Sequence, residues 1–321
     1  DMEWTTVEPR GTIYSWERAH HPVHPALRGH APYIVALIEL PHAGSVRMIG
    51  NLLGDPLQTV RIGAPVEAVF ESHDDTTPPF TLKVGRTVDE STSDWPPRAS
   101  APKDAPNVMY IVLDDVGYAA LGCYGSPVCK TPHMDKLAKN GIRYNNFHTV
   151  ALCSPSRSCF LTGRNHHSVG VGCLANFDSG YPGYRGKIAK EAGTMAEMLR
   201  AHGYRNYMLG KWHVTPLTES GATGPFDGWP LGRGFDRFYG FLDAETDQFA
   251  PELVSDNTHI DPPGIYADGY HLTSDLIDQS IRFIADHTAD RPDIPWLTWV
   301  ALGACHAPHQ APMDIIKSYD S

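Results

Sequence analysis

The chain has 321 residues, of which 41% are hydrophobic, so it is long enough and apolar enough for two folded domains. Lysine and arginine number 26 against 37 acidic residues, and the formal net charge of −11 disfavours a general nucleic-acid or anionic-membrane binder. A local basic pocket for one small anion remains compatible with this charge. Because no apolar run reaches the length of a membrane span and no N-terminal signal pattern is present, we expect no membrane partner and a cytoplasmic protein.

The six cysteines contain no C-x-x-C pair. Nothing in their spacing predicts a zinc ribbon or a redox dithiol, and no pairing into disulfides is indicated.

The first 86 residues predict a small all-β domain. Short strands are expected at 11–16, 33–40, 47–52 and 65–70, and their close spacing without a helical period favours a β-barrel. His20, His21 and His24 are too irregularly spaced to favour a metal site over a loop of solvated histidines.

Several motifs in this domain resemble the OB-fold half of the DUF35 family, whose members accompany acyl-CoA thiolases and hydratases. They are GTIYS at 11–15, HP at 24–25, PYIVAL at 32–37, NLLG at 51–54 and VRIG at 60–63. The resemblance implies an OB fold and an acyl-CoA enzyme as a partner of this domain. The four-cysteine zinc ribbon that precedes the barrel in that family is missing from this sequence.

Residues 87–105 are rich in Ser, Thr, Pro and Asp and predict a linker, after which the pattern changes to α/β. A continuous apolar strand of the buried, parallel kind is expected at 108–113, and further strands at 204–209 and 296–302. Thr194 and Glu197 form a capping box that begins a helix, which Gly203 ends. An amphipathic helix is expected at 274–287. This alternation predicts a doubly wound sheet with its ligand site beyond the carboxyl ends of the strands.

Polar side chains follow three of these strands. Asp114 and Asp115 suit a hard cation such as Ca²⁺ or Mg²⁺, the alternative being helix capping. Lys211 and His213 combine a fixed positive charge with a proton donor or acceptor, the alternative being a structural pair. His306 would be structural if it stood alone, but it also lies just past a strand.

The segment Cys153-Ser154-Pro155-Ser156-Arg157 predicts the start of a helix, with Ser154 as its cap and Pro155 in its first turn. Unpaired backbone N–H groups and the helix dipole make position 153 a favourable place for an anion. Arg157, one turn further along, can reach the same place. The alternative, a buried cysteine beside a surface arginine, is disfavoured by the LTGR sequence that follows at 161–164.

With the C-x-P-x-R and LTGR motifs, residues 106–321 resemble the type I, formylglycine-dependent sulfatases, and arylsulfatases in particular. The resemblance implies an alkaline-phosphatase-like doubly wound sheet and oxidation of Cys153 to formylglycine by a formylglycine-generating enzyme. It implies a catalytic set and a Ca²⁺ or Mg²⁺ site. The catalytic set is Cys153, Arg157, Lys211, His213 and His306, and the metal ligands are Asp114, Asp115 and Cys153.

The resemblance also implies a function, hydrolysis of a small-molecule sulfate ester. Two alternatives stay open: a phosphonate or phosphodiester hydrolase of the same superfamily, and a non-catalytic binding protein associated with acyl-CoA enzymes. Segments 232–241 and 245–248 resemble arylsulfatase loops, and they predict either a substrate rim or a structural role.

The resemblance also bears on the extent of the domain. In this family further metal ligands follow later in the chain, beyond Ser321. We therefore expect domains at 1–86 and 106–321 joined by the linker 87–105, with the second a C-terminally truncated sulfatase portion that is poorly active alone.

Overall fold

The computed structural model describes residues 10–19, 33–43, 46–52, 55, 57–67, 87, 89–92 and 99–319. Contacts within the chain group it into two compact units, Asp1–Pro97 and Arg98–Ser321. The boundary between them falls inside the segment 87–105 that its composition predicts to be a linker. His20, His21 and His24, which the sequence assigns to a solvated loop, lie outside the described residues.

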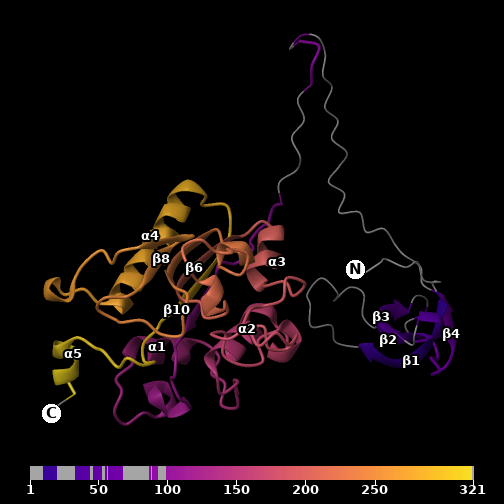
Figure 1. Ribbon diagram of the computed structural model, residues 1–321, viewed down its shortest axis with the longest axis horizontal. Coiled ribbons are helices and arrows are strands. Elements are labelled where there is room, and N and C mark those ends of the chain that lie inside the picture. Colours follow the sequence, from indigo (N-terminus) through magenta and orange to yellow (C-terminus); the bar gives the residue numbers. More distant parts are fainter. Residues whose placement is uncertain are drawn as a thin grey trace. The chain divides into compact units, whose positions relative to one another are not determined.

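The first unit contains an antiparallel sheet of four strands in the order β3-β2-β1-β4 (Figure 1). The strands are β1 (Arg10–Ala19), β2 (Tyr33–Leu40), β3 (Val46–Leu52) and β4 (Pro65–Glu67). Each matches a predicted strand, and residues 68–70 of the fourth lie outside the described part of the chain. The side chains of Ile13, Ile34 and Ala36 are buried. These pairings confirm the all-β fold predicted for this region.

The second unit is built on a six-stranded sheet in the order β5-β10-β6-β7-β8-β9 (Figure 1). Four strands run parallel: β5 (Val108–Val112), β10 (Trp296–Ala301), β6 (Arg205–Lys211) and β7 (Arg237–Phe241). Two short strands, β8 (Leu253–Ser255) and β9 (Thr258–Ile260), extend the sheet in antiparallel fashion. β10 lies between β5 and β6 and runs parallel to both. The carboxyl ends of these three strands, which are distant in sequence, therefore lie side by side at one end of the sheet.

Helices cover both faces of this sheet (Figure 1). α2 (Cys153–Thr162) and α3 (Met195–Ala201) pack on one face, and α4 (Leu272–Asp290) packs on the other. α1 (Pro132–Asn140) lies between β5 and α2 in the chain, and α5 (Met313–Lys317) follows β10. The doubly wound α/β fold predicted from the sequence is therefore confirmed.

The capping box predicted for α3 is present. The hydroxyl of Thr194 accepts the backbone N–H of Glu197 at 3.1 Å, and the Glu197 carboxylate accepts that of Thr194 at 2.6 Å. Gly203, just after the helix, adopts the left-handed conformation with φ of 83°. Local hydrogen bonding thus begins and ends this helix where the sequence predicts.

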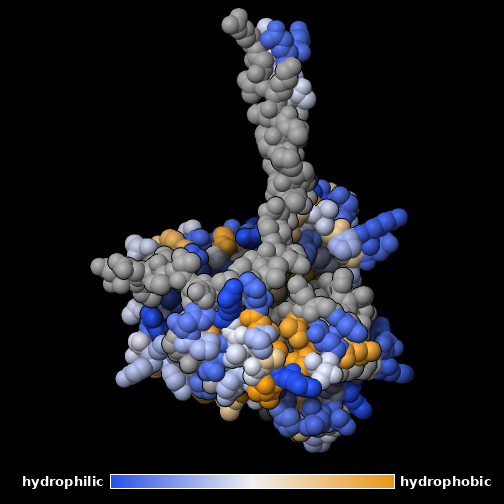
Figure 2. All heavy atoms as spheres, turned by 90° about the vertical axis from the view of Figure 1, so that its right-hand side faces the viewer, coloured by the Kyte–Doolittle hydropathy of each residue, from blue (hydrophilic) through white to orange (hydrophobic). Residues whose placement is uncertain are grey.

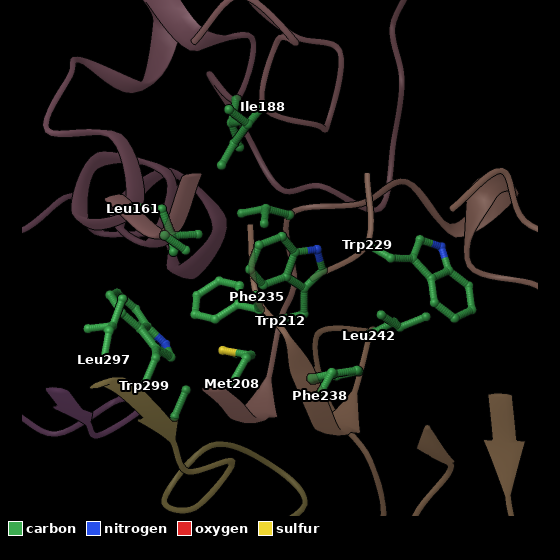
Figure 3. Close-up of a cluster of buried hydrophobic side chains, with 14 of the residues drawn as sticks. Leu161, Ile188, Met208, Trp212, Trp229, Phe235, Phe238, Leu242, Leu297 and Trp299 are labelled. Atoms are coloured by element: carbon green, nitrogen blue, oxygen red, sulfur yellow. The ribbon is translucent and has the colours of Figure 1, made fainter. Parts of the chain in front are cut away.

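Successive residues of the central strands enter different cores. Met208 and Trp299 belong to the cluster that contains Leu161 of α2, which Figure 3 shows facing the sheet. Their neighbours Leu209 and Val300 belong to the cluster beneath α4. This alternation follows from the two-residue period of a strand, and it buries both faces of the sheet.

The burial predicted for the first strand of this sheet is wrong. An apolar run at 108–113 predicts a strand covered on both faces, yet Met109, Tyr110 and Ile111 are 46%, 37% and 53% exposed. β5 lies at the sheet edge, where β10 is its one partner among the described strands. Apolar composition does not distinguish an edge strand from a central one, since that depends on the order of strands in space.

Other boundaries shift by a few residues. β6 ends at Lys211, so this lysine belongs to the strand, and α4 is longer at both ends than the predicted 274–287. In the described ranges no helix combines the length and apolarity that crossing a bilayer requires. On the face drawn in Figure 2, hydrophobic patches lie among hydrophilic side chains.

Candidate active site

Three strand ends supply the polar residues that the sequence singled out. Asp114 and Asp115 follow β5, Lys211 ends β6 with His213 just beyond it, and His306 follows β10. Backbone pairing continues past the end of β5, because the N–H of Cys305 donates to the carbonyl oxygen of Asp114 at 3.1 Å. The parallel arrangement therefore places these groups at one edge, as predicted.

The N-terminal part of α2 adds Cys153 and Arg157. Cys153 is the first helical residue and follows the extended residue Leu152, while Arg157 lies one turn later. Ser154 does not cap the helix, contrary to the prediction. It is completely buried inside the first turn, and its hydroxyl accepts the backbone N–H of Ala175 at 3.0 Å. A tertiary contact with another loop thus replaces the local one.

A buried charge cluster lies beside this helix. One carboxylate oxygen of Asp114, Oδ2, is 2.5 Å from Lys211 Nζ and 3.5 Å from Arg157 Nη2. Arg157 also donates from Nη1 to the backbone carbonyl of Lys211 at 2.8 Å. All three residues are at most 5% exposed. Burial lowers the pKa of Arg157, and the negative charge of Asp114 opposes that shift.

The cluster leaves Arg157 with an unused donor. Its Nε is buried and has no hydrogen-bond partner among the described residues. Two cations therefore flank one carboxylate, and one of them retains a free N–H group, which suits the binding of an anion.

The nucleophile candidate contacts a histidine. Cys153 Sγ lies 3.1 Å from His213 Nδ1, and His213 Nε2 lies 2.8 Å from Asn176 Oδ1. The amide of Asn176 is oriented in turn, because its Nδ2 donates to Asp243 Oδ1 at 2.8 Å. Asn176 thus presents an acceptor, so His213 carries its proton on Nε2 and turns the lone pair of Nδ1 toward Cys153.

The environment keeps this imidazole neutral. Burial, followed by the positive charges of Lys211 and Arg157, lowers the pKa of His213 from 6.5 to about 2. The backbone of His213 adopts the left-handed conformation, with φ of 48°. His213 is therefore a neutral imidazole whose Nδ1 can accept a hydrogen bond from the cysteine side.

Asn176 and Asp243 are site residues that the sequence analysis missed. Asn176 lies in the loop between α2 and α3 and belongs to no recognisable motif. Asp243 follows the carboxyl end of β7 by two residues, and the sequence analysis missed it because it predicted that strand as part of a loop.

His306 lies further out, between two exposed carboxylates. Its Nε2 is 3.9 Å from Asp115 Oδ2, and its Nδ1 is 3.7 Å from Glu245 Oε2 and 2.7 Å from the backbone oxygen of Ala307. The side chains of Asp115 and Glu245 are 63% and 57% exposed, against 20% for His306. His306 is thus placed at the solvent-facing rim of the site.

The predicted rim segments divide into two kinds. In 232–241, Arg233 is buried and donates to the backbone oxygen of Ala192 at 2.6 Å, while the ring of Phe235 packs against Trp212 (Figure 3). This part is structural, the alternative that the sequence left open. In 245–248, Glu245 reaches His306 and contributes to the rim.

The candidate metal ligands are of the right chemical type for Ca²⁺ or Mg²⁺, but they are fewer than such a cation needs. Asp114 and Asp115 offer carboxylate oxygens, which Ca²⁺ and Mg²⁺ prefer. Within residues 99–319 and the shorter described segments, no three His, Cys, Asp or Glu side chains converge to hold a metal ion. The predicted metal ligands Asp114, Asp115 and Cys153 therefore stay a prediction, and Asp114 is paired with Lys211 and Arg157.

This arrangement defines the class of protein. A sheet covered on both faces, with a nucleophile, an acidic pair and fixed cations at its carboxyl edge, is suited to hydrolysis of an anionic ester. Residues 106–321 match the family model described as Sulfatase, and residues 4–71 match that of the ChsH2, C-terminal OB-fold domain. The chain belongs to the sulfatase family, with an OB-fold domain at its N-terminal side.

Similar proteins include several arylsulfatases. The chain is 43% identical to human arylsulfatase A over 138 residues, which are 42% of this chain and 25% of that protein. It is 29% identical to the arylsulfatase of Klebsiella aerogenes over 234 residues, 68% of this chain and 47% of the relative.

A solved structure has a similar fold. The crystal structure of Ps i-CgsB in complex with k-i-k-neocarrahexaose is 25% identical, with a TM-score of 0.54, and the match covers 68% of this chain and 49% of that one. The chain spans about a quarter to a half of the length of the curated relatives it matches.

Proposed function

We propose that this chain is a sulfuric ester hydrolase of the arylsulfatase type, in which Cys153 is converted to formylglycine beside a bound Ca²⁺ or Mg²⁺. The observation that carries the proposal is the position of Cys153. It lies at the first turn of α2, against a proton acceptor at 3.1 Å and next to an arginine that has an unused buried donor. The similarity to arylsulfatases supports the same reaction.

The fixed cations are assigned to charge stabilisation. Lys211 and Arg157 hold their positive charges in a buried cluster whose geometry is set by Asp114, so they need no rearrangement when a sulfate group arrives. Preorganised charges in a site that excludes water stabilise the transition state more than mobile ones.

The two histidines are assigned to proton transfer. A hydrated formylglycine supplies one hydroxyl to attack sulfur and a second whose deprotonation releases sulfate and regenerates the aldehyde. His213 Nδ1 faces position 153 and is assigned to accept the proton of that second hydroxyl, once the negative sulfate group offsets the positive charges of Lys211 and Arg157 that lower the pKa of His213. His306 lies at the rim, where it can protonate the departing alcohol oxygen.

The cation would be held by Asp114, Asp115 and an oxygen at position 153. When bound, it supplies positive charge next to the sulfate oxygens. Because no three possible ligand side chains converge among the described residues, we expect these residues by themselves to bind the cation weakly and to be poorly active.

Mass spectrometry tests the first step. The chain is co-expressed with a formylglycine-generating enzyme, and the peptide that contains Cys153 is measured. We expect a lighter, aldehyde-bearing residue that reacts with a hydrazide, whereas Cys153→Ala gives no such product. An unmodified thiol under these conditions contradicts the proposal.

Parallel assays test the reaction class. The matured chain is supplied with excess Ca²⁺ or Mg²⁺ and given 4-nitrophenyl sulfate or bis(4-nitrophenyl) phosphate. Faster turnover of the sulfate, lost in Cys153→Ala, is expected. Preferential turnover of the phosphodiester would favour the related phosphodiester hydrolases instead.

A further inference from the structure

A hollow of about 250 Å³ lies between α4 and the strands β7 and β8, and we call it the α4 hollow. Its strand side is formed by Arg237 and Tyr239 of β7 and by Ser255 of β8. Arg237 begins β7 and pairs in register with Tyr207 near the amino end of β6, whereas Lys211 ends β6 at the candidate active site. α4 also covers the face of the sheet opposite to α2 (Figure 1). The α4 hollow is therefore separate from the candidate active site.

The helix side of the α4 hollow combines one buried ring with charged and polar groups. Gln279, Arg282, Phe283 and Asp286 lie at intervals of three and four residues, so their side chains share one face of α4. Phe283 is buried, Gln279 is half-buried, and Arg282 and Asp286 are exposed. The charged groups of this face thus stand at the mouth of the hollow, above an aromatic ring.

The guanidinium group of Arg237 is held in a defined position. Its central carbon lies 4.3 Å from the centroid of the Phe283 ring, a cation–π contact. Phe283 is 5% exposed, and its ring lies 5.9 Å from that of Tyr207. Arg237 Nε is 3.7 Å from Asp256 Oδ2, and within the described ranges the terminal N–H groups of Arg237 donate no hydrogen bond. These N–H groups are oriented in advance and can bind a ligand.

A second guanidinium group lines the same hollow without a partner. In the part of the chain that the structure describes, Arg282 makes neither a hydrogen bond nor an ion pair, although Asp286 lies one turn further along α4. A guanidinium group presents several N–H donors in a planar fork that matches the oxygens of a phosphate. The chain carries a formal net charge of −11, so two arginines around one hollow are a local concentration of positive charge.

The remaining polar groups restrict which anion fits. The carboxylate of Asp286 repels a bare anion, but it can accept a hydrogen bond from a hydroxyl group on the same ligand. The side chains of Gln279 and Ser255 make no hydrogen bond to any described residue and can bind further polar atoms. The hydroxyl of Tyr239, in contrast, donates to Asp275 Oδ2 at 2.7 Å. The lining therefore suits a ligand that carries both an anionic group and a hydroxyl group.

We propose that the α4 hollow is a binding site for a small phosphate monoester that also carries a hydroxyl group. Arg237 and Arg282 bind the phosphate oxygens, and Asp286 accepts the hydrogen bond of the hydroxyl group. A phosphate monoester carries about −1.5 to −2 charges at neutral pH, which two guanidinium groups balance. The site takes no part in cleavage at position 153, so the inference goes beyond the proposed function and does not depend on it.

Isothermal titration calorimetry of the full chain with glycerol 3-phosphate, at constant ionic strength, tests the site. We expect affinity to fall about tenfold in Arg237→Ala and in Arg282→Ala, because each variant loses a charge-assisted contact to the phosphate. Arg282→Lys keeps the charge without the planar fork and should bind with intermediate affinity. The matched control is Arg291→Ala, which removes the same charge from an exposed arginine just after α4, outside the hollow, and should bind like the parent.

Two further ligands test the chemistry. Methyl phosphate has the same anionic group and no hydroxyl, so the parent should prefer glycerol 3-phosphate and Asp286→Ala should lose this preference. Methyl sulfate carries less negative charge and should bind more weakly than methyl phosphate.

The outcomes that overturn the inference are distinct. Absence of glycerol 3-phosphate binding, unchanged affinity in Arg282→Ala, or an equal loss in Arg291→Ala overturns the α4 hollow as an anion site. A preference that survives in Asp286→Ala overturns the role of the hydroxyl group, and tighter binding of methyl sulfate overturns the choice of phosphate. Circular dichroism establishes that each variant is folded. The titrations need neither formylglycine nor a cation, so they are independent of sulfate-ester hydrolysis.

Discussion

Removing one partner of the buried ion pair between Lys211 and Asp114 should strongly destabilise the second unit, because it leaves the other charge buried. Methionine at position 211 keeps most of the side-chain volume and removes the ammonium group. The Asp114 carboxylate, 5% exposed, is then left with Arg157 at 3.5 Å as its one cationic partner among the described residues. An uncompensated buried charge is costly because it has lost its hydration.

The geometry sets the magnitude. At an effective dielectric constant of about 20, a separation of 2.5 Å corresponds to an attraction of roughly 7 kcal/mol before the cost of desolvation. Removing one partner of a buried pair typically costs about 3–5 kcal/mol. Because Arg157 still contacts the same oxygen, we expect Lys211→Met to lower the free energy of unfolding by about 3 kcal/mol, at the lower end of that range.

Urea denaturation followed by tryptophan fluorescence measures this effect. The matched control is Lys187→Met, which breaks a partly exposed pair with Glu219 and should cost at most about 1 kcal/mol. The double variant Asp114→Asn/Lys211→Met removes both charges and should recover part of the loss. Equal urea midpoints for Lys211→Met and Lys187→Met would refute the reasoning.

Further predictions concern a buried tyrosine, a tight strand pairing and the site amide. Tyr207→Phe removes the hydroxyl that contacts His287 Nδ1 at 2.7 Å, and it should cost about 1–3 kcal/mol in urea denaturation. Burial raises the pKa of Tyr207 from 10.0 to about 12. The contribution of its hydroxyl to the free energy of unfolding is therefore full below pH 10 and is lost as the pH rises through 12. If Tyr207→Phe loses stability at alkaline pH as steeply as the parent protein does, this reasoning is wrong. Gly210 has φ of 88°, and a Cβ at this position would clash with β10, so Gly210→Ala should lower the free energy of unfolding by about 3 kcal/mol or more in urea denaturation. The control Gly193→Ala places its Cβ in open space and should be neutral. Similar losses of stability in the two variants would refute the predicted clash. Asn176→Leu removes the acceptor that fixes the site imidazole, so ¹⁵N NMR should show its proton shared between both ring nitrogens, and an unchanged Nε2–H form would argue against that role.

Much of the fold follows from short-range patterns. The capping box at Thr194 and Glu197 determines a helix start through contacts three residues apart. Apolar runs locate the four strands of the first unit and β5, β6 and β10 of the second, whereas β7, β8 and β9 were not predicted as strands. The sequence also indicates the residues of the candidate site, because polar side chains follow the predicted strands and the carboxyl ends of parallel strands lie on the same side of a sheet. Arg157 follows Cys153 by one helical turn, which brings both to the same place.

Only the tertiary structure determines those properties of a residue, such as burial and hydrogen-bond partners, that depend on segments distant in the chain. β5 is exposed because strand order puts it at the edge, and its apolar sequence carries no record of that order. Ser154 pairs with Ala175 in place of capping its own helix, and Asn176 reaches His213 across 37 residues. Propensity and periodicity are properties of a few consecutive residues, whereas burial, ion pairing and the orientation of an imidazole arise only once separate segments pack together.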